Sequence, residues 1–155
     1  MPLTITTGPS PAAVAEIEYR LSMMNGGGDG ISRGDGDEGL VEMQRPVSMK
    51  VDVGTFRGYI TKSMVRHVAV TASSTITAPT GGSVGDIRRI DIVQYTLGTG
   101  VNVVAGTESA SPAAPSKSAN SILLANISLR KGMVSIKDTS DGTNGFIDTT
   151  VREFV

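Results

Sequence analysis

Residues 86–115 contain the feature that most constrains the fold, two apolar β-type runs separated by a glycine turn. The runs IDIVQY (90–95) and VNVVA (101–105) flank the turn LGTG, whose glycines permit the positive φ that a tight hairpin needs. In the first run two isoleucines point to one face, and Val93 and Tyr95 point to the other. This pattern predicts a central strand that is covered on both sides.

Further short runs with strand-like patterning lie on both sides of this hairpin. Gly, Pro and Asn turns separate them at near-regular spacing, and no βαβ alternation is present, so the sequence predicts a mainly β chain with an antiparallel β-sandwich or jelly-roll-like domain. In the run after the Pro-rich connector, alternate residues from Leu123 to Leu129 are expected to share one face. The other expected strands cover 47–53, 56–60, 65–70, 73–78, 122–129, 133–136 and 146–155.

The first 25 residues predict an extended arm followed by one short α-helix. Residues 2–9 have too little apolar surface to fold alone, whereas Ser10 can cap a helix that begins with a proline. Glu16 and Arg20 are spaced for an i,i+4 ion pair. We expect a helix over 11–24, which packs either on its own β-domain or on a neighbouring subunit. Its apolar stripe consists of Val14, Ile17, Leu21 and Met24.

A composition break divides the chain into three expected parts. Residues 1–25 are the arm and helix, residues 26–43 are a Gly/Asp-rich linker, and residues 44–155 are the β-sandwich domain. The segment GDGDEG (34–39) matches a phosphate-loop pattern, but it lacks a preceding strand and its acids would repel a pyrophosphate. It also lacks the distal glutamate of a calcium loop. We expect no cofactor and no metal site, apart from a weak adventitious cation at this loop as an unfavoured alternative.

Composition restricts the classes of partner. The 155 residues correspond to one ordinary domain, and the formal net charge is −1, with 14 basic and 15 acidic residues. Because there is no strong positive field, we expect no binding to nucleic acid, and because no long apolar run occurs, we expect no membrane span. Cysteine is absent, which excludes disulfides and thiolate metal ligands.

The search for catalytic residues returns no candidate that passes a physical test. GGSVG (81–85) matches a nucleophile-elbow pattern centred on Ser83, but the single histidine, His67, precedes it, and the elbow requires a strand-to-helix turn. A small serine hydrolase is therefore kept only as an unfavoured alternative. His67 is expected at a surface or edge position of a strand.

The order of strands and turns resembles a β-module of tailed-bacteriophage structural proteins. The matching segments are 89–93, 101–107, 111–115 and 123–136, and residues 49–60 are similar to the strand pair that often precedes them. In that family the module occurs in capsid decoration and head-fibre proteins, and in baseplate and tail-fibre adaptors. The resemblance thus implies a virion part and no chemistry.

From the resemblance we expect a non-enzymatic virion protein that is assembled in the host bacterial cytoplasm. The favoured function is a capsid decoration (cement) or head-fibre base protein, a homotrimer that binds the major capsid protein and stabilises the head. The alternative is a baseplate or tail adaptor that joins a tail fibre to the tail. Arg88 and Arg89, with Asp86 and Asp91, form either ion pairs on an exposed face or an intersubunit contact. The expected partner-binding residues are Leu3, Ile5, Val14, Ile17, Leu21, Met24, Arg88 and Arg89.

Overall fold

The computed structural model describes residues 13–14, 16–17, 20, 28–33 and 38–155, and over these residues the chain is mainly β. Most strand pairs are antiparallel, which confirms the predicted fold class. The strands are β1 (Gly30–Ile31), β2 (Val41–Met43), β3 (Val51–Val53), β4 (Phe56–Ile60), β5 (Ser63–His67), β6 (Thr71–Ala72), β7 (Ile87–Thr96), β8 (Gly100–Val104), β9 (Ser121–Arg130), β10 (Ile136–Lys137) and β11 (Gly145–Asp148).

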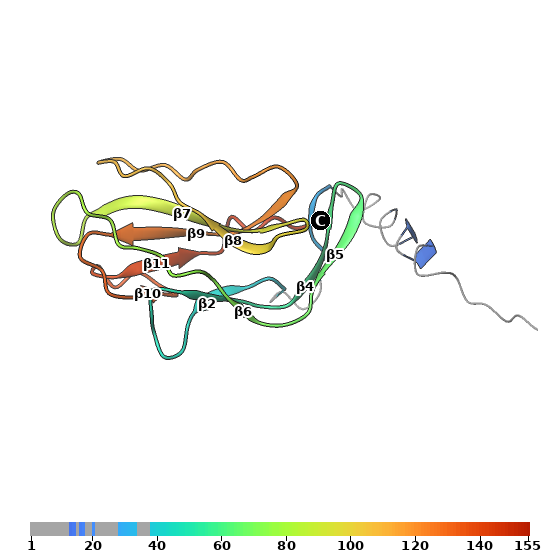
Figure 1. Cartoon of the computed structure of the whole chain (residues 1–155), viewed down its shortest axis with the longest axis horizontal. Coiled ribbons are helices and arrows are strands. Elements are labelled where there is room, and N and C mark those ends of the chain that lie inside the picture. The colour runs from blue at the N-terminus through green and yellow to red at the C-terminus, as the bar shows by residue number, and fades with distance from the viewer. Residues whose placement is uncertain (1–12, 15, 18–19, 21–27, 34–37) are drawn as a thin grey trace, which may run out of the picture.

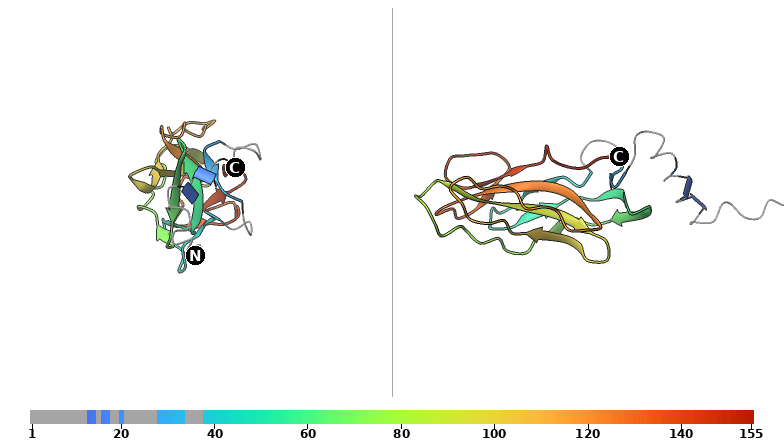
Figure 2. Two further views of the ribbon diagram at one scale, coloured as in Figure 1. Left: turned by 90° about the vertical axis from the view of Figure 1, so that its right-hand side faces the viewer. Right: turned by 90° about the horizontal axis from the view of Figure 1, so that it is seen from above.

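Three sheets build an elongated sandwich (Figures 1 and 2). The largest has the order β10-β11-β9-β7-β8, and the small sheets β2-β3-β6 and β1-β4-β5 pack against it. The β4–β5 hairpin lies at one end of the sandwich, and the loop before β7 lies at the opposite end (Figure 1). This arrangement gives the molecule two distinct ends.

The core lies between the five-stranded sheet and the two small sheets. It is made almost entirely of Val, Ile and Leu, because aromatic residues make up only 4% of the chain. Burial of these branched side chains is the main favourable term for folding. The largest fully buried apolar side chains are those of Ile31, Ile60, Ile92, Ile122, Leu124, Ile127, Leu129 and Ile136.

As the sequence predicted, β7 and β8 form the central hairpin. Thr96 pairs with Gly100 across the turn, where Gly98 has φ 80° and Gly100 has φ 87°. Four consecutive residues of β7, 91–94, are buried, so this strand is covered on both faces. One cover is the connector between β8 and β9, whose Ser118 donates its N–H to Oε1 of Gln94 at 2.9 Å.

The prediction that Leu123 shares one face of β9 with the alternate residues up to Leu129 is wrong. The register with β7 shifts between the pairs Val93↔Ala125 and Gln94↔Leu123, which leaves Leu124 as the extra residue of a β-bulge. A bulge reverses the alternation of faces beyond it, so Ile122 and Leu124 are fully buried and Leu123 is only half-buried.

The strands that the sequence predicted before and after β4 differ from those in the structure. Residues 44–50 form a loop, in which Ser48 Oγ donates to Gln44 Oε1 and accepts the N–H of Lys50, so local side-chain bonds replace a ladder. The strand expected over 65–70 is shifted to β5, and Val68 and Val70 are 70% and 64% exposed. In the expected strand 73–78, only isolated bonds such as Ser73 N–H to Val51 O are present.

The predicted linker over 26–43 is wrong in part, because it contains β1 and β2. Ile31 is fully buried in the core, and its N–H donates to Glu153 O at 2.9 Å while its carbonyl accepts the N–H of Val155 at 2.9 Å. The C-terminal strand expected over 146–155 is therefore divided: β11 pairs with β9, and the last residues bond to β1. The β-domain accordingly begins before residue 44.

The predicted N-terminal helix is described at Ala13, Val14, Glu16, Ile17 and Arg20, which have helical backbone. Arg20 Nε lies 2.8 Å from Glu16 Oε1, as the spacing predicted, and Val14 and Ile17 are 38% and 53% exposed. Leu3, Ile5, Leu21 and Met24 lie outside the described residues. Among the described residues no helix combines the length and the apolar character that a membrane crossing requires.

Candidate surface at the β4–β5 end

The β4–β5 hairpin closes through a two-residue turn formed by Thr61 and Lys62, which have φ values of 49° and 65°. Positive φ is unfavourable for a β-branched residue, so the surroundings must hold this turn in place. The N–H of Thr61 donates to Asp29 Oδ1 at 2.8 Å, and its hydroxyl donates to Asn120 Oδ1 at 3.0 Å. These two bonds anchor the hairpin tip to the segments before β1 and β9.

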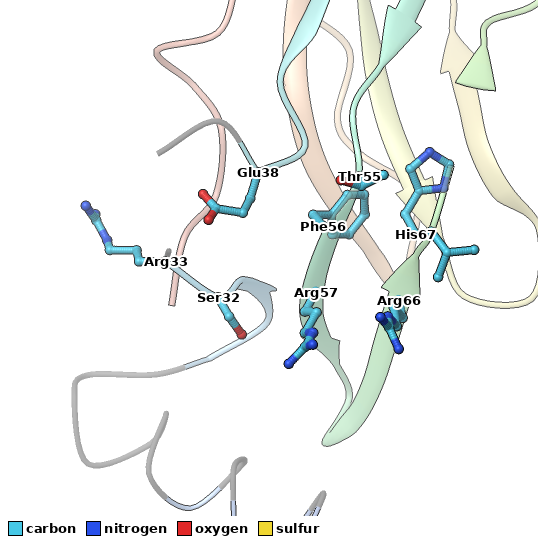
Figure 3. A pocket seen from close by; sticks show the side chains of 9 residues that line it. Ser32, Arg33, Glu38, Thr55, Phe56, Arg57, Arg66 and His67 are labelled. Atoms are coloured by element: carbon cyan, nitrogen blue, oxygen red, sulfur yellow. The ribbon is translucent and has the colours of Figure 1, made fainter. Parts of the chain in front are cut away.

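An open pocket of about 480 Å³ lies beside the first residues of β4 and the last residues of β5 (Figure 3). Its lining combines arginine, glutamate, hydroxyl and apolar side chains from four parts of the chain, which are the β1 end, the segment before β2, β4 and β5. The lining residues are Ser32, Arg33, Glu38, Thr55, Phe56, Arg57, Arg66, His67 and Val68.

Two of these arginines are directly paired across the hairpin. Arg57 of β4 is the register partner of Arg66 of β5, both side chains are exposed, and they lie side by side in Figure 3. Among the described residues neither has a carboxylate within ion-pairing distance. Like charges in directly opposed positions repel, so this pair opposes hairpin formation unless an anion lies between the two side chains.

The other side of the hairpin is apolar and aromatic. The His67 ring packs 5.5 Å from the Phe56 ring and 5.9 Å from the Tyr95 ring, and its Nε2 is buried without a hydrogen-bond partner in the described chain. The sequence predicted a surface or edge position for His67, and β5 is an edge strand of its sheet. Within the described ranges no group of three or more His, Asp or Glu residues is placed to hold a metal ion.

Arg33 reaches the pocket from the segment after β1 and lies against the C-terminal aromatic residue. Its guanidinium is 4.9 Å from the Phe154 ring centroid, and the guanidinium of Arg152 is 4.7 Å from the same centroid. Stacking on an aromatic ring orients an arginine without neutralising its charge. The pocket therefore has an excess of positive charge, because it is lined by three arginines and one carboxylate, that of Glu38.

Arg89 forms the predicted ion pair with Asp91, but the pair is buried rather than exposed. The side chains are 11% and 2% exposed, and Arg89 Nε and Nη2 donate to the two carboxylate oxygens at 2.7 and 3.0 Å. The expected exposed location of this ion pair is therefore wrong, and a partner-binding role for Arg89 stays a prediction. The side chain of Arg88 lies against Gly82, and a partner-binding role for Arg88 stays a prediction.

Ser83 does not lie on a nucleophile elbow. It is exposed in the loop before β7, its N–H donates to Asp86 Oδ2 at 3.0 Å, and the chain continues into a strand rather than a helix. The only histidine, His67, packs on Phe56 and Tyr95. The local geometry that the serine-hydrolase alternative needs is therefore missing at Ser83.

A second, smaller pocket of about 330 Å³ is lined by Met43, Lys137, Asp138, Thr139 and Asp141. Its two acids are used in loop structure, since Asp138 Oδ1 accepts the N–H of Met43 at 2.6 Å. Hydrogen bonds from the Asn144 side chain, and then from the N–H groups of Asn144 and Thr143, lower the pKa of Asp141 to about 2. Asp141 thus stabilises the loop between β10 and β11, and Asp138 joins that loop to β2.

Comparisons of the chain with protein-family models, with curated proteins and with solved structures found no match. The resemblance to a bacteriophage β-module therefore stays a prediction from the sequence.

Proposed function

We propose that the chain is a non-enzymatic structural protein of a tailed-bacteriophage virion, namely a capsid decoration or head-fibre base protein that binds the major capsid protein as a homotrimer. One observation carries most weight: the β4–β5 end combines exposed arginines with the exposed apolar residues Val68 and Val70, and the described helical residues lie on the same side (Figure 1). Apolar and charged residues gathered at one end suit a surface that attaches to another protein.

Attachment would stabilise the head by mass action. A protein that binds the assembled shell, but not the separate capsid subunits, shifts the equilibrium toward the shell. Repetition over many copies, each held at several points as a trimer, increases the total stabilisation without requiring a tight single contact. A small sandwich with one attachment end is sufficient for this role.

A baseplate or tail adaptor is the second candidate, and the far end of the sandwich favours it. Val84 and Val134 are 76% and 77% exposed, on the loops before β7 and after β9. An adaptor needs a second surface for a second partner, and these two loops supply an apolar one. The two candidates differ in which particle part the chain binds.

Deletion of residues 1–27 tests the attachment role of the arm. We expect the shortened chain to keep its β structure, because the described core begins at Ile31 and β1 is retained. We expect it to be lost from capsids during co-sedimentation, since the proposed contacts Leu3, Ile5 and Leu21 are removed. Circular dichroism checks the fold, and full-length Arg45→Gln, which changes an exposed arginine outside the pocket, is the matched control. Undiminished sedimentation of the deletion variant with capsids would contradict the arm contacts.

A further inference from the structure

The outer edge of β5 is free in the described chain. In the sheet order β1-β4-β5, this strand pairs only with β4. In a hairpin with a two-residue turn, the pair next to the turn is hydrogen-bonded, and the following cross-strand pairs alternate between non-hydrogen-bonded and hydrogen-bonded pairs. Here the pair next to the turn is Ile60↔Ser63. Arg57↔Arg66 is therefore a non-hydrogen-bonded pair. The N–H and C=O groups of Met64 and Arg66 consequently point away from β4, toward the free edge.

The same alternation brings the two arginine side chains close together. Side chains of a non-hydrogen-bonded pair approach more closely than those of a hydrogen-bonded pair, so Arg57 and Arg66 repel each other more than two arginines of a hydrogen-bonded pair would. Arg33 lines the same pocket. A carboxylate opposite Arg66, within reach of both long side chains, would relieve their repulsion and accept charge-assisted hydrogen bonds from both guanidinium groups.

An apolar side chain lies one step further along this edge. Val68 lines the pocket and is 70% exposed, and Val70 follows at 64%. Inorganic phosphate would neutralise the arginines but would leave this apolar surface in water. An extended peptide with an acidic residue two positions from an apolar residue presents both side chains on one face, so it would match both features and would also bond to the free backbone groups.

We propose that the β5 edge, with Arg57, Arg66 and Val68, binds an extended acidic segment of a protein partner by strand addition. The inference rests on the proposed attachment function only for the identity of that partner, because the chemistry of the site comes from the hairpin itself. Backbone bonds to Met64 and Arg66 supply affinity, and the arginines select a carboxylate at the opposing position. The segment thereby becomes an outer strand of the sheet β1-β4-β5.

The test uses the purified full-length chain and the synthetic peptide acetyl-Glu-Thr-Val-Thr-Glu-amide, whose two glutamates and central valine lie on one face of the extended peptide. We expect binding in calorimetry, with the largest NMR shifts at the amides of Met64 and Arg66. Arg66→Gln should lower the affinity for the peptide about tenfold, which is the loss expected for one charge-assisted hydrogen bond. Arg57→Gln/Arg66→Gln should abolish detectable binding, whereas Arg45→Gln, at an exposed arginine outside the pocket, should bind as the wild type does.

Two further probes separate strand addition from simple anion binding. The same peptide with alternate N-methylated amides keeps its charges but cannot complete the backbone ladder, and we expect it to bind at least tenfold more weakly. Inorganic phosphate should not displace the unmodified peptide at equal concentration. Equal binding of the methylated peptide, displacement by phosphate, or equal affinity in the Arg57→Gln/Arg66→Gln variant would overturn the proposal. None of these measurements involves virions, so their outcome is independent of the proposed function.

Discussion

Asp91→Ala should lower the free energy of unfolding by about 3–5 kcal/mol, the range found when one partner of a buried ion pair is removed. Asp91 is 1% exposed and accepts hydrogen bonds from Arg89 and, at 3.0 Å, from the N–H of Gly106. Arg89 also donates to Thr77 O at 2.9 Å. Together, Asp91 and Arg89 therefore join the segments on both sides of the central hairpin, and loss of the carboxylate leaves a largely buried guanidinium without its hydrogen-bonded counter-ion. Urea unfolding at fixed pH and protein concentration measures the change.

The double variant Arg89→Leu/Asp91→Leu provides the control for this interpretation. Removing both charges eliminates the uncompensated guanidinium and leaves only the lost hydrogen bonds, so the double variant should be more stable than Asp91→Ala. Stability of Asp91→Ala within about 0.5 kcal/mol of the wild type, the range of an ordinary surface substitution, would show that the pair is not buried in solution.

Ile31→Ala should lower the free energy of unfolding by about 2–5 kcal/mol, because a large apolar side chain is removed from a filled core. Ile31 is fully buried although the glycine-rich sequence around it is typical of a linker. A residue in a solvated linker would give almost no change, so the measurement separates the two assignments. Denaturant unfolding of Ile31→Ala and of Val84→Ala, which is 76% exposed in the wild type, gives the comparison.

Val84→Ala should have the same unfolding midpoint as the wild type, because the exposed Val84 side chain makes few contacts that the substitution could remove. Equal midpoints for Ile31→Ala and Val84→Ala would show that β1 is not part of the folded domain. In that case the domain boundary expected near residue 44 would be correct.

The parts of the fold that the sequence predicted depend on local signals. Alternating apolar residues, two glycines and a polar turn define β7, β8 and the turn between them, and each signal lies within a few residues of the structure that it specifies. The i,i+4 pair of Glu16 and Arg20 is equally local. Such features are readable because no distant segment is needed to form them.

The features that were missed depend on distant partners. Ile31 is the only large apolar residue in 25–39, and its strand exists because β4 and the C-terminal residues bond to it. The bulge at Leu124 is defined by the register in which β9 pairs with β7. Neither position has a local pattern that distinguishes it, so tertiary pairing determines the outcome.

The arginine pair at the candidate surface had a readable signal that was not used. Arg57 and Arg66 lie at equal distances from the turn formed by Thr61 and Lys62. Once that turn is known, the pairing of the two arginines follows by counting. The turn was not recognised in the sequence because neither of its two residues is glycine, which is the usual marker of such a turn.

Immunogold labelling of intact virions tests the central proposal most directly. Antibody against residues 38–155 would be applied to virions of any tailed phage found to carry the gene for this chain, and the particles would be imaged by electron microscopy, with antibody against the major capsid protein as the positive control. A head protein predicts label distributed over the head, and an adaptor would place it at the neck or tail tip. Absence of this label on particles that carry the control label would contradict the virion assignment itself.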